Sequence, residues 1–293
     1  MKTQTFALFF FCLTAVVLSV RPASAQWLYD EEGQVCFVPG RPDVDGNGAP
    51  DNNADTGDDH YQSFWQGDQE WVNFLWNGFS FDTADWDNGF GYENVDDVNL
   101  PLARTLNGLI ALYVSVPDQV TSTQDYNGSP LRWGGNFAWS NIDELDGRCI
   151  SDLPPYFALT KHGSPFDNWT KLTVPFFFET WAAERAMIIF HEARHAEGYT
   201  HNVGNWECFQ GGSCDSHWDY WGANTMEVWW AWNYWYEAIN TPARSKKVVK
   251  NTANFRLANS FRDRPPYWIN CGTPEDPCCL SGIPGTPPVP CNP

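Results

Sequence analysis

The alternation of apolar and polar residues predicts three helices in the middle and later parts of the chain. In residues 99–116, Leu, Ile and Tyr recur at three- and four-residue intervals behind Pro101, a residue favoured in the first helical turn. Residues 178–197 are rich in Ala and Glu and precede Gly198, which suits a glycine C-cap. Residues 223–239 contain six Trp and Tyr residues, so we expect burial on more than one side.

The first 25 residues have the pattern of a secretory signal peptide. Lys2 precedes an apolar run at 6–20, and small residues at 23–25 provide a cleavage site after residue 25. The apolar run is short for a bilayer-spanning helix. We therefore expect an exported protein, extracellular or periplasmic, with no membrane contact after the signal is removed.

The rest of the chain is strongly acidic. The 293 residues include 17 Lys and Arg against 36 Asp and Glu, a formal net charge of −19. Removal of residues 1–25 takes away Lys2 and Arg21 and no acid, which lowers the charge by two. Because nucleic-acid binding needs a basic surface, we expect no nucleic-acid partner. A cation suits this field better.

Cysteine usage and composition divide the chain further. Removal of Cys12 with the signal leaves eight of nine cysteines, an even number that predicts up to four disulfides in an exported protein. Residues 26–100 contain 17 acids and one base among many Trp, Gly and Asn, which predicts loops with short elements. Residues 101–264, which contain the three predicted helices, would form the next domain, and the Pro- and Cys-rich residues 265–293 an irregular extension stapled by disulfides.

The strongest chemical signal lies inside the helix predicted over 178–197. His191 and His195 are four residues apart, so both imidazoles share one helix face and can bind one Zn²⁺. Glu192 lies beside the first histidine and can take a proton from metal-bound water. His201 follows after Gly198, a residue that permits the positive φ of a sharp turn back toward the metal.

The full string at 191–201, HEARHAEGYTH, reads HExxHxxGxxH and resembles the signature of the metzincin zinc metalloproteases. The resemblance implies that His191, His195 and His201 are zinc ligands and that Glu192 is the general base. It also implies that residues 101–264 form a metal-binding domain of the α+β, helix-dominated zincin-like class, here with long irregular disulfide-stapled loops. Met226, the only methionine after the motif, is the candidate for the family's Met-turn, with burial in the core as the alternative.

Other residues near the motif leave alternatives open. Glu227 is a rival third ligand, as in HExxH enzymes that take a Glu from a downstream helix. Its structural interpretation is a capping box with Asn224 as N-cap. His217 and Asp219 fit support of a ligating histidine better than ligation. For an oxyanion-stabilising tyrosine, the family position holds Val228, so the remaining candidates are Tyr199 and Tyr220.

A second metal signal lies in the acidic N-terminal region. Residues 43–51 follow the first half of a calcium loop, with oxygens at loop positions 1, 3, 5 and 9 and a glycine at position 6. Position 12 is alanine, with an aspartate one residue later as a substitute. The candidate Ca²⁺ ligands are Asp43, Asp45, Asn47, Asp51 and Asp55. The alternative is a solvated acidic linker.

These observations lead to two hypotheses of function. The first is a secreted zinc-dependent metallopeptidase or related amide hydrolase that acts on a peptide or protein, with water activated by Glu192. The second is a non-catalytic, calcium-dependent extracellular binding module with a structural or vestigial metal site. In the second hypothesis, tryptophans among Asn, Asp and Gly line a groove for a polar ligand: Trp65, Trp71, Trp76 and Trp86. The alternative is that the tryptophans pack in the core.

Overall fold

The structure is a computed structural model that describes residues 26–30, 33–38, 57–119, 128–149, 157–162, 168–203, 213–265 and 269. The expected signal peptide lies outside the described residues, as does most of the 265–293 extension. The same holds for the candidate calcium ligands Asp43, Asp45, Asn47, Asp51 and Asp55.

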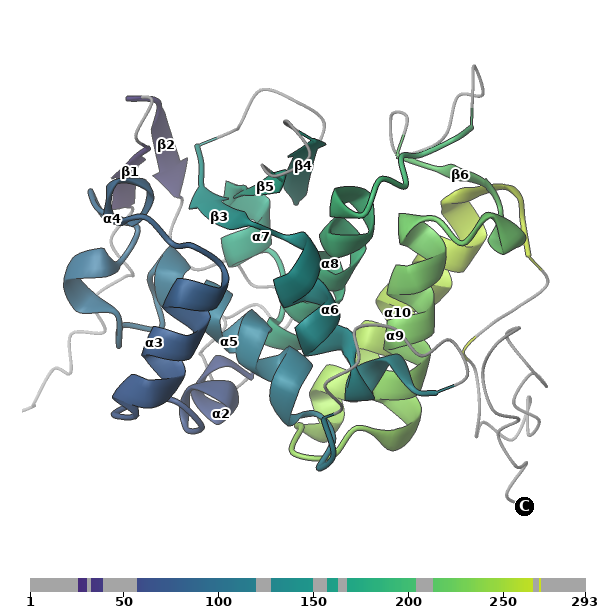
Figure 1. Cartoon of the computed structure of the whole chain (residues 1–293), viewed down its shortest axis with the longest axis horizontal. Coiled ribbons are helices and arrows are strands. Elements are labelled where there is room, and N and C mark those ends of the chain that lie inside the picture. Colours follow the sequence, from purple (N-terminus) through teal and green to yellow (C-terminus); the bar gives the residue numbers. More distant parts are fainter. Residues whose placement is uncertain are drawn as a thin grey trace, which may run out of the picture.

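The described residues form a helix-rich α+β fold with three small sheets (Figure 1). The helices are α2 (Asp58–Gln62), α3 (Gln69–Gly78), α4 (Thr83–Trp86), η1 (Tyr92–Asn94), α5 (Pro101–Val114), η2 (Pro130–Arg132), α6 (Gly134–Asn141), α7 (Val174–Phe178), α8 (Ala182–Ala196), η3 (Trp218–Tyr220), α9 (Ala223–Glu237) and α10 (Ala243–Asn259).

The strands pair in three separate sheets. Strands β1 (Gln26–Tyr29) and β2 (Val35–Val38) form an antiparallel hairpin, and β6 (Asp215–His217) pairs in parallel with β7 (Phe261–Asp263). The largest sheet has the order β3-β5-β4, with bounds Glu144–Gly147, Asn168–Leu172 and Ala158–His162. In this sheet β3 is parallel to β5 and β4 is antiparallel to it, so β4 lies at one end of the three strands.

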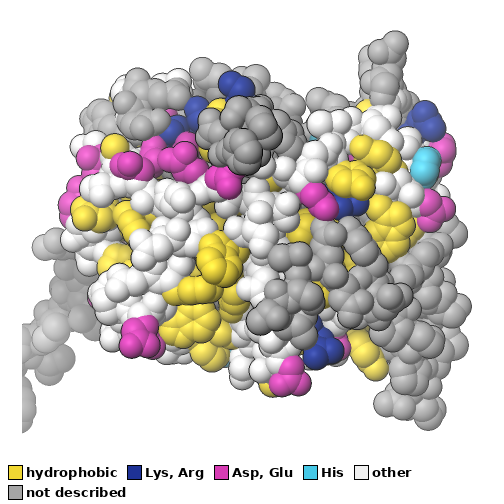
Figure 2. All heavy atoms as spheres, viewed as in Figure 1, with side chains coloured by type: hydrophobic (Ala, Val, Ile, Leu, Met, Phe, Trp, Pro, Cys, Tyr) yellow, Lys and Arg dark blue, Asp and Glu magenta, His cyan; other side chains and the backbone are white. Residues whose placement is uncertain are grey.

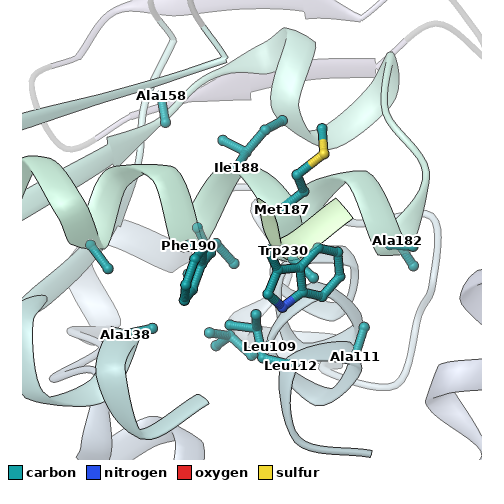
Figure 3. Close-up of a cluster of buried hydrophobic side chains, with 14 of the residues drawn as sticks. Leu109, Ala111, Leu112, Ala138, Ala158, Ala182, Met187, Ile188, Phe190 and Trp230 are labelled. Carbon is teal, nitrogen blue, oxygen red and sulfur yellow. The ribbon is translucent and has the colours of Figure 1, made fainter. Parts of the chain in front are cut away.

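Helix α8 lies at the centre of the fold and contacts α5, α6, α9, α10 and β4. Figure 3 shows part of this core: Met187, Ile188 and Phe190 of α8 lie among side chains that include Leu109 of α5 and Trp230 of α9. All residues of α8 except His195 are buried. A helix buried on nearly every side has its position fixed by packing, which makes it a rigid support for side chains that carry chemistry.

The three helices expected from the sequence are present. The pattern at 99–116 corresponds to α5 and that at 223–239 to α9, which is buried on all sides from Ala223 to Tyr234. The helix predicted over 178–197 corresponds to α8, but the predicted start is four residues too early, since α8 begins at Ala182. The Glu184 carboxylate accepts the backbone N–H of Trp181 at 3.0 Å, which caps the new helix and separates it from α7.

The acidic N-terminal region contains more helix than its composition indicates. Side chains of Asp68 and Asp82 accept the first backbone N–H groups of α3 and α4, so acids typical of loops here act as helix N-caps. A single cluster of buried hydrophobic residues extends from Tyr61 to Ile269. Residues 57–100 therefore share their core with residues 101–264.

Surface charge, cysteine state and helix length can be described for the residues that the structure covers. Figure 2 shows more Asp and Glu than Lys and Arg on the viewed face. Cys149 and Cys214 are both disulfide-bonded. Among the described residues, no helix combines the length and the apolar character that a membrane span requires.

Ion pairs among three buried charged residues connect α8 to α2 and α5. Asp58, at the start of α2, forms ion pairs with Arg185 of α8 and Arg104 of α5, and none of the three side chains is more than 5% exposed. Arg185 also donates to the backbone oxygens of Arg104 at 2.9 Å and Thr180 at 2.7 Å. Burial lowers the pKa of Arg185 to about 10, against the attraction of Asp58. Asp58 is thus ion-paired with two buried arginines.

We expect Asp58→Asn to lower the free energy of unfolding by about 3 to 5 kcal/mol, because it removes a buried carboxylate that is ion-paired with two buried guanidinium groups. Urea unfolding followed by tryptophan fluorescence measures this change. Asp59→Asn is the matched control, since Asp59 is exposed in the same helical turn; we expect it to cost less than about 1 kcal/mol. Equal effects of the two variants would contradict the proposed role of Asp58.

Candidate metal centre

The chain reverses its direction at the C-terminal end of α8. Gly198 has φ +109°, as the motif predicts. Its N–H donates to the carbonyl of His195 at 2.8 Å, and the N–H of Tyr199 donates to the carbonyl of Arg194 at 3.3 Å. This pair of bonds is the Schellman motif, which ends a helix and reverses the chain. The reversal brings His201 back beside the last turn of α8.

Three imidazoles converge at this point. The Nε2 atoms of His191 and His195 are 3.1 Å apart, and those of His195 and His201 are 3.2 Å apart. The ligand atoms of all three residues lie within 4.8 Å of one another. His191 is buried, and the other two are partly exposed, so the cluster is accessible from one side.

The second ring nitrogen of each histidine faces a hydrogen-bond acceptor. Nδ1 of His191 lies 2.9 Å from Glu227 of α9, and Nδ1 of His201 lies 2.9 Å from Asp215 of β6. Nδ1 of His195 lies 2.6 Å from the backbone oxygen of Tyr199. Carboxylates and carbonyls only accept hydrogen bonds, so these contacts favour a proton on each Nδ1. The amide nitrogen of Asn224 also lies near Nδ1 of His201, but at 3.4 Å it is farther than Asp215.

This assignment determines what the three Nε2 atoms can do. A neutral imidazole protonated on Nδ1 has a lone pair on Nε2, and three such lone pairs point to one region here. They cannot form hydrogen bonds with one another, and their partial negative charges repel. A cation bound between them removes this conflict.

The donor set fits zinc. Three imidazole ligands are typical of catalytic zinc sites, which keep a further position open. Tetrahedral coordination with Zn–N distances near 2.05 Å would place ligand nitrogens about 3.3 Å apart, close to the 3.1 and 3.2 Å between neighbouring Nε2 atoms. Partners on the far ring nitrogens, as seen here, are what orient ligating histidines in zinc proteins.

Glu227 is placed behind His191 and uses both of its oxygens there. One oxygen faces His191 Nδ1, and the other accepts from Nε of Arg256 on α10 at 3.1 Å. Burial opposes the charge of Glu227, but Arg256 and His191 outweigh it, so the pKa of Glu227 is lowered. Burial likewise opposes the charge of His191, but Glu227 outweighs it and the pKa of His191 is raised. Of the two alternatives for a third ligand, His201 is the one that joins the other histidines.

The expected capping box at the start of α9 is wrong. The helix begins after Gly222, and Asn224 lies inside it. The Asn224 side chain donates instead to the carbonyl of Ser213 at 3.1 Å, and its backbone N–H donates to Asp215 at 3.2 Å. Asp215, on β6, thus accepts a backbone N–H in the first turn of α9 in place of a local N-cap side chain, and it also contacts His201.

The structure places the other candidates near the motif as follows. Met226 lies in the first turn of α9, fully buried, with its N–H bonded to the carbonyl of Gly222, so it is part of a helix and of the core. Tyr220 donates its hydroxyl to the backbone oxygen of Thr200 at 2.7 Å. The guanidinium of Arg194 lies over the Tyr199 ring and is ion-paired with Glu197.

Two expectations about supporting residues are wrong. His217 and Asp219 are exposed, and Asp215, two residues before His217, supports His201 instead.

The four-tryptophan groove does not form, since Trp65 and Trp86 are fully buried. Their indole N–H groups donate to Asn107 and to the carbonyl of Leu145. Trp71 and Trp76 are partly buried.

Glu192, the expected base, is buried and contacts the sheet. Its Oε2 accepts from the hydroxyl of Thr160, on β4, at 2.7 Å. The carboxylate is close enough to His191 to raise the pKa of that imidazole. Sequence reasoning missed Thr160, Asp215 and Arg256, because nothing in their local sequence relates them to the motif.

A second cluster of acids lies on the face of the β3-β5-β4 sheet that points away from α8. Asp85, Glu144 and Asp146 bring carboxylate oxygens within 4.8 Å of one another beside a pocket of about 420 Å³. Arg148 forms ion pairs with Asp85 at 2.7 Å and Asp146 at 2.9 Å. The guanidinium therefore already supplies these two acids with a positive partner, and we interpret the cluster as structural.

We expect the metal-free protein at alkaline pH to hold His191, His195 and His201 as the Nδ1–H tautomer, because each Nδ1 faces an acceptor. Long-range ¹H–¹⁵N spectra of histidine-labelled protein distinguish the tautomers. His60 is the internal control: its Nε2 lies 2.7 Å from the backbone oxygen of Asn240, so it should show the opposite tautomer. A protonated Nε2 on His195 would contradict the arrangement.

Comparison of the chain with protein-family models, with curated proteins and with solved structures gives no match. The interpretation of the three histidines therefore depends on their own geometry and on the string at 191–201.

Proposed function

We propose that the chain is an exported zinc-dependent metallopeptidase or a related amide hydrolase. The observation that carries the proposal is the convergence of three Nε2 atoms whose rings are each held through Nδ1. The zincin-like fold belongs to the same proposal. It is supported by a central helix that carries two of the histidines, a second long helix that carries Glu227, and a small sheet against the first helix.

His191, His195 and His201 would hold the ion, and Glu192 would handle protons. A bound Zn²⁺ lowers the pKa of a coordinated water to about 7 and polarises a carbonyl. Glu192 accepts a proton as the water oxygen forms its bond to the carbonyl carbon. When the C–N bond breaks, Glu192 delivers that proton to the departing amine nitrogen.

A peptide is the substrate class that the surroundings favour. Strand β4 lies at the end of its three-stranded sheet, beside α8, and its Thr160 contacts Glu192. An extended peptide can add to such a strand through main-chain hydrogen bonds. This position would bring a backbone amide close to the base.

We expect the purified protein to contain one zinc per chain and to degrade a protein substrate in a zymogram, with activity lost after chelation. Glu192→Gln should retain zinc and reduce turnover by roughly 100- to 10,000-fold, because it removes the proton acceptor. Glu197→Gln is the matched control, since Glu197 lies on the same helical segment and pairs with Arg194; it should retain wild-type turnover.

Undiminished turnover in Glu192→Gln, or the absence of zinc from active protein, would overturn the proposal. If zinc is present and neither protein shows turnover, the metal site would be structural, which is the alternative of a non-catalytic module.

The carboxylates behind the histidines give a separate prediction about affinity. Glu227→Gln and Asp215→Asn should each weaken zinc binding by about 10- to 100-fold, because each removes a charged acceptor that orients a ligand. Competition with a chromophoric chelator measures the dissociation constants. Asp219→Asn, an exposed change nearby, should leave the affinity unaltered. Equal affinities for all three variants would show that these contacts do not support the metal.

A further inference from the structure

Glu192 is held by a pair of threonine hydroxyls on two neighbouring strands. Thr160 of β4 lies 2.7 Å from Glu192 Oε2, and its oxygen also lies 2.7 Å from the hydroxyl oxygen of Thr170 on β5. The two threonines are register partners in the antiparallel β4–β5 pair. Their side chains therefore emerge on the same face of the sheet, toward α8.

The chemistry of the groups determines the direction of these hydrogen bonds. An ionised Glu192 can only accept, so Thr160 donates its single proton to Oε2. The Thr160 oxygen is then left as an acceptor, and Thr170 donates to it. Thr170 is fully buried, so its hydroxyl is held against competition from solvent. The result is a directed chain from β5 through β4 to the carboxylate.

This chain leaves one carboxylate oxygen available. In the described part of the chain, Glu192 Oε1 accepts no hydrogen bond from protein, whereas Oε2 is engaged by Thr160. A carboxylate with one oxygen fixed cannot rotate freely, so the other oxygen keeps a defined direction. A displacement of about 1 Å in a reacting group can lower a rate about 100-fold.

We propose that Thr160 is a positioning residue for Glu192, supported by Thr170, and that this hydroxyl pair fixes the direction of the oxygen that takes the proton. The inference depends on the proposed hydrolase function for its effect on rate. Its structural content, the orientation of Glu192, can be tested without any activity.

The test compares Thr160→Val with Thr160→Ser. Valine has the shape of threonine without the hydroxyl and suits a strand, so the variant should fold. We expect kcat to fall roughly 10- to 100-fold with KM and zinc content unchanged. Serine restores the hydroxyl and should restore most of kcat. Thr170→Val should have a smaller effect, because Thr160 can still donate.

Crystal structures give a readout that does not require turnover. The Glu192 carboxylate should adopt a different or multiple orientation in Thr160→Val and the wild-type orientation in Thr160→Ser. Thr105→Val is the matched control, since the Thr105 hydroxyl is buried but bonds within α5 to the carbonyl of Pro101; it should leave both kcat and Glu192 unchanged.

The outcomes separate this inference from the proposed function. If the wild type hydrolyses substrate and Thr160→Val matches it in kcat and in Glu192 orientation, the positioning role is wrong and the hydrolase stands. If the wild type binds zinc but shows no turnover, the hydrolase is wrong, and the crystal structures alone decide whether Thr160 orients Glu192.

Discussion

Imidazole lone pairs that point at one another repel, and this repulsion is the constraint on which the structure around α8 depends. The rings are held in place by acceptors from three different segments: Glu227 on α9, Asp215 on β6 and the carbonyl of Tyr199. Because the acceptors of His191 and His201 come from outside the motif, the cluster depends on the tertiary fold as well as on the helix. If the three rings bind an ion as proposed, they are already oriented for it before the ion arrives.

The same helix is anchored at both ends by buried charge. Toward its N-terminus, Arg185 pairs with Asp58; toward its C-terminus, His191 is linked through Glu227 to Arg256 on α10. Buried charges are tolerated only when paired, and removal of one partner is costly. The two arrangements therefore fix the position of α8 from both directions. Packing of aromatic and aliphatic side chains between them leaves little freedom for the helix to shift.

The sequence was informative where function or structure depends on neighbouring residues. Helical spacing predicted α5, α8 and α9, and the spacing of the motif predicted both the shared face of His191 and His195 and the positive φ of Gly198. It was not informative where the contact joins distant segments. Nothing local distinguishes Asp215 from Asp219, yet only the first faces His201. The prediction that Asn224 caps α9 was wrong for the same reason, because the backbone N–H of Asn224 donates to the distant Asp215 on β6.

Helix geometry explains why Glu192, the proposed base, has a support different from that of the proposed ligands. Consecutive residues on a helix point about 100° apart, so Glu192 cannot face the same direction as its neighbour His191. Its side chain instead contacts β4, where it accepts a hydrogen bond from Thr160. An acid at that position would repel Glu192, and a Lys or Arg would pair with it and make it a poorer proton acceptor. A hydroxyl orients the carboxylate without adding a formal charge, which suits the uptake and release of a proton proposed for Glu192.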